Sequence, residues 1–218
     1  MIRIWDQKTG QTVHNFPGAH KRDILCIDLS PDGNIVATAG LDMKIHLINT
    51  INGKFIADLA CGESKKEEKR RPKNDEELDE QAGEEEEEEE DDDNNSIESV
   101  TFCKSLPLVA CATLNGQIFV WDLNTHTLRA SYVNEKATGY TKLVWSSGGG
   151  PGGGALYAST VDGCFQVFDG RNLKLLKRMR CHTLEIFDFC LDDTAAQNVL
   201  YTASNDNTVK LFSLDSSQ

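Results

Sequence analysis

The chain has 218 residues, of which 39% are hydrophobic and 26% are charged, and its formal net charge at pH 7 is −13. No apolar run approaches the roughly 18 to 20 residues that a membrane-spanning helix requires, and the sequence shows no secretory signal peptide. These features argue against a membrane-inserted or secreted protein. The chain is predicted to be soluble and cytoplasmic, with a nuclear pool as a second option.

The negative charge is concentrated in one segment. Residues 61–96 contain 18 acidic and 6 basic residues, a net charge of −12. The rest of the chain has 17 acidic and 16 basic residues and is close to neutral. This separation predicts two folded parts, residues 1–60 and 97–218, with a disordered acidic insert (residues 61–96) between them.

Short apolar segments separated by turn residues predict strands along both folded parts. In chain order, strands are expected at Ile2–Asp6, Thr12–Phe16, Ile24–Leu29, Ile35–Ala39, Lys44–Ile48, Phe55–Leu59, Ile97–Cys103, Leu108–Thr113, Gln117–Leu123, Leu128–Val133, Thr141–Trp145, Ala155–Thr160, Cys164–Phe168, Leu173–Lys177, Glu185–Leu191, Val199–Ala203 and Thr208–Leu214. Helical periodicity is absent from these parts, so the predicted fold class is all-β.

A four-strand unit recurs along the chain. The third strands of successive units align as KIHLIN, QIFVWDL, CFQVFDG and TVKLFSL, and each follows a turn that contains Asp or Asn. The period is about 40 to 50 residues, apart from the gap made by the acidic insert. This pattern, with Trp-Asp near the end of a third strand, is typical of the WD40 repeat of β-propellers.

The first and last units are incomplete. The first has only its last two strands, and the last ends before its outer strand. The pattern therefore predicts a WD40 β-propeller of about four blades plus a bare strand, which form part of a seven- or eight-bladed ring. On this interpretation the chain is the C-terminal half of a longer protein, and a self-contained small or dimeric ring is the alternative.

Polar residues recur at equivalent positions of the units, which favours a structural role. In WD40 folds a His, a turn Asp, a Ser or Thr and a strand Trp hydrogen-bond to one another and tie the strands of a blade together. In the last unit His182, Ser204 and Asp206 could do this, with Phe212 in place of Trp. The residues predicted to have a structural role in the blades are Trp5, Asp6, His20, Asp42, Trp121, Asp122, Asp162, Asp169, His182, Ser204 and Asp206. A catalytic site usually occurs once, and no Walker, nucleophile-elbow or zinc motif is present. We therefore expect no enzymatic activity, no cofactor and no metal site.

The seven cysteines do not suggest disulfides or metal ligands, because their number is odd and no pair has metal-ligand spacing. Five of them lie inside predicted strands between apolar residues: Cys26, Cys103, Cys111, Cys164 and Cys190. A thiol in that setting packs as a small hydrophobic group, so buried thiols in a reducing compartment are expected.

The acidic insert contains an unbroken run of ten carboxylates. The run consists of Glu84, Glu85, Glu86, Glu87, Glu88, Glu89, Glu90, Asp91, Asp92 and Asp93. It could be a tolerated loop insertion, or an electrostatic collector that speeds encounter with a basic partner. Such a run would repel nucleic acid, and it lacks the ordered loop that tight calcium binding requires. The preceding Lys65–Lys73 cluster fits either a nuclear localisation patch or pairing with the acidic run.

Two segments resemble a particular WD40 family. NNSIESVTFCKSLPLVACATLNGQIFVWDLNTHTLR (residues 94–129) and LYASTVDGCFQVFDGRNLKLLKRMRCHTLEIFDF (residues 156–189) resemble the C-terminal half of the angio-associated migratory cell protein family. The resemblance extends back through AHKRDILCIDLSPDG and covers nearly all of the chain outside the insert. It implies one of two roles: in fungi, a ribosome-assembly chaperone that holds the basic tail of a large-subunit ribosomal protein; in animals, a cytoplasmic and membrane-proximal adaptor in cell migration.

The sequence thus favours a non-enzymatic protein-binding adaptor or chaperone that shields a basic ribosomal protein segment, with the acidic run as its binding region. A signalling scaffold in cell migration is the alternative. Neither hypothesis requires direct nucleic-acid binding or membrane insertion. No individual binding residue is transferred from the family.

Overall fold

The computed structural model describes residues 1–62, 95–146, 154–192 and 199–214, and within them the fold is all-β, as predicted. The strands are β1 (Ile2–Trp5), β2 (Thr12–Phe16), β3 (Ile24–Leu29), β4 (Ile35–Gly40), β5 (Lys44–Asn49), β6 (Phe55–Ala60), β7 (Ile97–Phe102), β8 (Leu108–Thr113), β9 (Gln117–Asp122), β10 (Thr127–Val133), β11 (Tyr140–Trp145), β12 (Ala155–Thr160), β13 (Cys164–Asp169), β14 (Leu175–Arg180), β15 (Ile186–Asp192), β16 (Val199–Ser204) and β17 (Val209–Ser213). No helix in the described residues is long and apolar enough to span a membrane.

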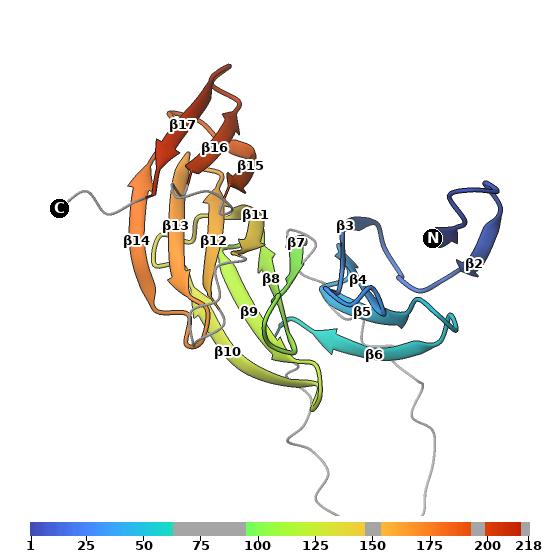
Figure 1. Cartoon of the computed structure of the whole chain (residues 1–218). Helices are drawn as coiled ribbons and strands as arrows, with labels where there is room; N and C mark the ends of the chain where they lie inside the picture. Colours follow the sequence, from blue (N-terminus) through green and yellow to red (C-terminus); the bar gives the residue numbers. More distant parts are fainter. Residues whose placement is uncertain (63–94, 147–153, 193–198, 215–218) are drawn as a thin grey trace, which may run out of the picture.

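The strands form antiparallel meanders that follow one another in chain order (Figure 1). Strands β3–β6, β7–β10 and β11–β14 make three four-stranded sheets; β1 and β2 make a two-stranded sheet and β15–β17 a three-stranded one. In each of the last four sheets the first strand is an edge strand, and β3, β7, β11 and β15 lie next to one another in that order. We call these four the inner strands.

Two kinds of turn recur in successive sheets, and each kind keeps the same backbone geometry. In the turn before the third strand of a sheet, the residue after the Asp or Asn has positive φ: Met43, Gly116, Gly163 and Asn207. In the hairpin after the third strand, the side chain of the Asp or Asn at the strand end accepts the backbone N–H of the residue two positions later. The residue four positions after that Asp or Asn has positive φ: Gly10, Gly53, His126 and Leu173. The recurring acids therefore shape turns.

Apolar side chains fill the space between successive sheets. Val36 and Ile48 pack with Ile2 of the first sheet, whereas a larger cluster around Ile45 and Ile97 lies between the second and third sheets. Further clusters lie between the third and fourth sheets and between the fourth and fifth. Because each sheet buries apolar groups against its neighbours, the sheets stabilise one another as blades of a propeller do.

One polar side chain on each inner strand links it to the next inner strand. Asp28 of β3 accepts the N–H of Phe102 of β7 at 2.8 Å, and Ser99 of β7 accepts the N–H of Leu143 of β11 at 3.0 Å. Thr141 of β11 then donates to the Ile186 carbonyl of β15 at 2.5 Å. The sheets are thus held in register by hydrogen bonds as well as by apolar packing.

Two sequence predictions about strands need correction. The first strand is not bare, because β1 pairs with β2 from Ile2↔Phe16 to Trp5↔Thr12. The outer strand of the fourth sheet begins at Leu175 rather than Leu173, because Leu173 has φ 55° and belongs to the hairpin turn. Most of the acidic insert (residues 63–94) lies outside the described residues, and so do the Lys65–Lys73 cluster and Glu84–Asp93.

Candidate functional site

The last sheet contains a His–Asp–Thr network that ties its strands together. His182 Nδ1 lies 2.9 Å from Asp206 Oδ2, and His182 Nε2 lies 2.7 Å from Thr202 Oγ1. The hydroxyl in this network is that of Thr202, not that of Ser204 as predicted. Ser204 instead donates to the Glu185 carbonyl at 2.7 Å and accepts the Asp206 N–H at 3.2 Å. The side chains of Thr202 and Ser204 therefore both stabilise the local structure of this sheet.

The second sheet repeats this network and adds a second histidine. His20 Nδ1 lies 2.9 Å from Asp42 Oδ2, and His20 Nε2 lies 2.8 Å from Thr38 Oγ1. His46, across from Thr38 on β5, stacks edge-on against His20 with ring centroids 3.9 Å apart. Burial lowers the pKa of His20, with a further contribution from His46, although the hydrogen bond to Asp42 opposes both. The sequence did not indicate His46, because this position carries no His in the other units.

The fourth sheet uses its turn aspartate differently. Asp162 accepts the Thr160 hydroxyl at 2.5 Å and pairs with Arg178 Nη2 of β14 at 3.2 Å, so its partner is a guanidinium rather than an imidazole. Burial raises the pKa of Asp162, but the Thr160 hydrogen bond and the nearby cation outweigh it and lower the pKa overall. Asp162 therefore acts within the fold.

The Trp-Asp positions make local contacts in the described residues. Asp6, Asp122 and Asp169 cap hairpin turns through backbone N–H groups. Trp5 is 54% exposed, and the guanidinium carbon of Arg3 lies over its ring, 5.8 Å from the ring centroid. The partly buried Trp121 packs at the edge of an apolar cluster, and its Nε1 has no hydrogen-bond partner there. These tryptophans contribute apolar packing rather than hydrogen bonds.

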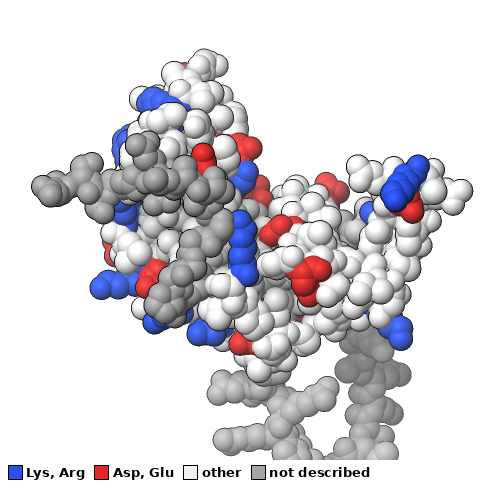
Figure 2. All heavy atoms as spheres, viewed as in Figure 1, with Lys and Arg blue, Asp and Glu red and all other residues white. Residues whose placement is uncertain are grey.

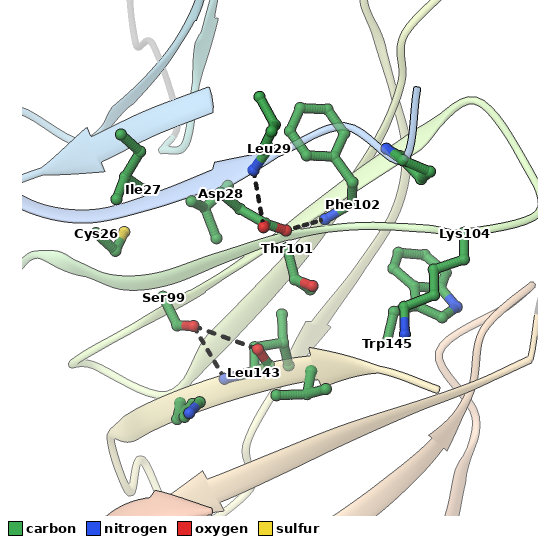
Figure 3. A pocket seen from close by; sticks show the side chains of 14 residues that line it. Cys26, Ile27, Asp28, Leu29, Ser99, Thr101, Phe102, Lys104, Leu143 and Trp145 are labelled. Atoms are coloured by element: carbon green, nitrogen blue, oxygen red, sulfur yellow. Dashed lines mark hydrogen bonds between the residues drawn. The ribbon is translucent and has the colours of Figure 1, made fainter. Parts of the chain in front are cut away.

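A cleft of about 600 Å³ runs along β3, β7 and β11 (Figure 3). Ile27, Leu29, Phe102 and Trp145 give it a largely apolar lining. Among its polar groups, Asp28 bonds to backbone N–H groups and Ser99 bonds to Leu143. Such a surface suits contact with another protein segment better than acid–base chemistry.

Both ends of the acidic insert are fixed at the same end of the sheets. The Cys61 N–H donates to Met43, and Asn95 Oδ1 accepts the Asn115 N–H at 3.2 Å. Met43 and Asn115 belong to the turns that precede the third strands, so we call this the Asp-turn end. On the face shown in Figure 2, acidic and basic side chains are interspersed. The charge asymmetry of the chain therefore comes from the insert.

The cysteines are all free, but one prediction about them is wrong. Cys103, Cys111 and Cys164 are buried, and Cys26 is partly buried, whereas Cys190 is exposed. Cys190 lies on β15, whose outward face is not covered by another sheet in the described part of the chain. Cys61 and Cys111 lie with their sulfur atoms 3.2 Å apart in the interior.

Comparisons with known proteins agree with the repeat analysis. The family model "WD domain, G-beta repeat" matches residues 10–49 and 173–213. Human angio-associated migratory cell protein is 32% identical over 222 residues, and the match covers 97% of this chain and 44% of that protein. The chain thus spans less than half the length of this relative, whose C-terminal portion it matches.

Solved structures give the same fold. Saccharomyces cerevisiae Sqt1 superimposes with a TM-score of 0.73 at 21% identity, covering 97% of this chain and 52% of that one. Chaetomium thermophilum Sqt1, solved bound to the N-terminus of the ribosomal protein L10, gives 0.67 at 20% identity and covers 89% and 44% of the two chains. The chain contains WD40 repeats and has the fold of β-propeller blades, and over nearly its whole length it is similar to angio-associated migratory cell protein.

Proposed function

We propose that this chain is part of a non-enzymatic adaptor or chaperone that shields a basic segment of a ribosomal protein. The observation that carries the proposal is the separation of charge. A net charge of −12 lies in the insert, and both anchor points of the insert lie at the Asp-turn end of the sheets. The WD40 fold supplies a protein-binding surface to which this charge is attached.

The physical reason for such an arrangement is competition with RNA. A newly made cationic segment binds RNA phosphates without selectivity. A dense carboxylate run attracts the same segment over about 8 Å, the Debye length at physiological salt. Ribosomal RNA, with its higher charge density, would later displace the chaperone. The complex of a Sqt1 protein with the N-terminus of ribosomal protein L10 supports this choice of partner class.

The test is direct binding of a basic peptide, the N-terminal segment of ribosomal protein L10, to the purified chain at low and high ionic strength. Fluorescence anisotropy and stopped-flow mixing would give the affinity and the association rate. We expect tight binding at low salt that weakens steeply with salt. Changing Glu84–Asp93 to Gln and Asn should slow association by about 10-fold or more, because electrostatic steering is lost.

The matched control keeps the charge and changes the order. A variant in which residues 75–93 are permuted has the same composition, so it should bind as the unmodified chain does. Salt-insensitive binding, or equal association rates for the charged and neutralised inserts, would contradict the proposal. The insert would then be a tolerated loop.

A scaffold in cell migration is the second candidate, favoured by 32% identity to angio-associated migratory cell protein. Its partners would bind through apolar and polar surfaces of the blades, such as the cleft along β3, β7 and β11. Affinity purification at low and high salt separates the two: one salt-sensitive basic ribosomal protein supports the chaperone, and salt-resistant signalling proteins support the scaffold.

We further propose a cytoplasmic location, with Lys65–Lys73 as the segment that would direct nuclear import. A fluorescent fusion of the chain tests this, because substitution of the basic residues of the Lys65–Lys73 cluster by Gln should remove any fluorescence from the nucleus. Neither role involves direct nucleic-acid binding or membrane insertion, and a gel-shift assay with ribosomal RNA checks the first of these.

A further inference from the structure

His20, Asp42 and His46 of the second sheet bring three metal-ligating groups together. One ligand atom from each residue lies within 4.8 Å of the other two. Asp42 Oδ2 is 2.9 Å from His20 Nδ1 and 3.5 Å from His46 Nε2. The side chains are 1%, 8% and 8% exposed for His20, Asp42 and His46. The three groups, from the segment before β3, the β4–β5 turn and β5, therefore converge where little solvent reaches them.

One of the two ring nitrogens of His46 makes no hydrogen bond in the described part of the chain. Its Nδ1 lies 2.5 Å from Asp58 Oδ1, so this nitrogen donates to the carboxylate. Its Nε2 is buried and has no hydrogen-bond partner among the described residues. The Nε2 atom lies 3.5 Å from Asp42 Oδ2, so a buried ring nitrogen without a hydrogen bond is directed at a carboxylate and is placed to ligate a cation beside it.

The last sheet has the same His–Asp–Thr network but a different residue at the position of His46. Thr38 pairs with His46 across the second sheet, and Thr202 pairs with Lys210 at the equivalent place. Lys210 supplies a fixed positive charge there, and its Nζ donates to the Cys181 carbonyl at 2.7 Å. In the second sheet an imidazole occupies the register position that Lys210 has in the last sheet, so this position carries a metal-ligating side chain instead of an ammonium.

The outer contacts of the cluster are those of a metal site. Metal-bound histidines usually donate their second N–H to a carboxylate or another oxygen, which fixes the ring. His46 has Asp58 in this role, and His20 has Thr38. The Asp58 side chain is 39% exposed, so the cluster has a connection to solvent. With neutral imidazoles, the two carboxylates give the site a charge of −2.

We infer that His20 Nδ1, Asp42 and His46 Nε2 form a binding site for a first-row divalent cation of the zinc class, in which the ion replaces the proton shared by His20 and Asp42. Two imidazoles and one carboxylate suit Zn²⁺, which takes His nitrogen and carboxylate oxygen in tetrahedral sites. A water would complete the coordination. The ion would join the segment before β3, the β4–β5 turn and β5 of one blade, so the site is structural.

The test is metal binding by the purified, chelator-treated chain, with Co²⁺ as a spectroscopic probe and Zn²⁺ in calorimetry. Co²⁺ held by imidazoles in a tetrahedral site absorbs strongly in the visible, whereas Co²⁺ held only by the carboxylates of the insert absorbs weakly. We expect one strongly absorbing Co²⁺ per chain, displaced by Zn²⁺, and a higher Tm in Zn²⁺.

Matched variants locate the site. His46→Gln and His46→Lys should both abolish the strong absorption, and His46→Lys should fold well because it copies the last sheet. Asp58→Asn should weaken Zn²⁺ binding by about 10- to 100-fold, as loss of an outer contact does. His126→Gln, which removes an exposed imidazole, should change nothing. Weak absorption alone in the unmodified chain, or unchanged affinity in both His46 variants, would overturn the inference.

Discussion

The backbone N–H of Phe102 donates to the Asp28 carboxylate at 2.8 Å, across 74 residues of sequence and across the acidic insert. The second oxygen of Asp28 accepts the N–H of Leu29, so one side chain holds β3 against β7. Asp28→Ala leaves the Phe102 N–H without this partner and should lower the free energy of unfolding by about 1–3 kcal/mol. Urea unfolding checks this, and Asp28→Asn, which keeps an acceptor, should lose less.

Gly163 joins the fourth sheet to the segment that leads into β15. Its carbonyl accepts the N–H groups of Cys181 and His182, and its φ is +79°. A Cβ at this position would lie 2.4 Å from the His182 carbonyl oxygen, so Gly163→Ala should cost roughly 2 kcal/mol or more. Gly10→Ala is the control, because φ is +68° there but the space is open. Equal losses of unfolding free energy in the two variants would exclude the steric effect.

Substitution of His126 by Gly should have the opposite effect on stability. It has φ 55° in the β9–β10 hairpin, at the position that Gly10 and Gly53 occupy in equivalent turns. A residue with a Cβ pays roughly 1–2 kcal/mol for this conformation, whereas the added freedom of Gly in the unfolded chain costs about 0.4–1 kcal/mol. His126→Gly should therefore raise the free energy of unfolding slightly, by up to about 1 kcal/mol. A lower Tm for this variant would show that the His126 side chain makes a contribution that the hairpin geometry does not reveal.

The stability of the last sheet should depend on pH through Asp206. The Thr208 hydroxyl, together with His182 and the backbone N–H groups of Thr183 and Thr208, holds the pKa of Asp206 well below its ordinary value of 3.8, against the effect of burial. A carboxyl with a lowered pKa stabilises the fold above its ordinary pKa, and this contribution is lost as the pH falls below 3.8. Asp206→Asn should thus be less stable near neutral pH but lose less stability on acidification.

The measurement is the free energy of unfolding at about pH 6 and about pH 3. The change between the two should be smaller for Asp206→Asn than for the unmodified chain. Asp23→Asn, which removes an exposed carboxylate, controls for the loss of one negative charge. Parallel pH curves for the unmodified and Asp206→Asn chains would contradict the prediction.

Thiol reactivity should follow burial rather than position along the chain. Burial raises the pKa of Cys26 to about 12 and that of Cys181 to about 11, and also raises that of the buried Cys111. Cys190 is exposed. Mild alkylation at neutral pH followed by peptide mass spectrometry should modify Cys190 first, because a buried thiol with a raised pKa provides little thiolate. Simultaneous modification of Cys26 and Cys190 would show that β3 opens readily.

The strands were predictable because each unit repeats the same apolar and turn pattern. The Thr–Asp spacing is also readable in the sequence: Thr38 precedes Asp42 by four residues, as Thr202 precedes Asp206, and this repetition favours Thr202 over Ser204. His46 could not be found in this way, since its position carries a different residue in each unit and repeat analysis discounts what does not recur. Cys190 was misplaced because an apolar strand does not reveal whether a further sheet covers it.

The fixed ends of the acidic insert make its length nearly free to vary. Cys61 and Asn95 are buried and bonded to turns of two different sheets, while β3 and β7 are joined directly through Asp28 and Phe102. Doubling a loop between fixed points costs only about 0.6 kcal/mol of closure entropy. Residues can therefore be added or removed between positions 63 and 94 without disturbing the register of the blades, which makes this junction suited to carrying a fused reporter or an altered number of charges.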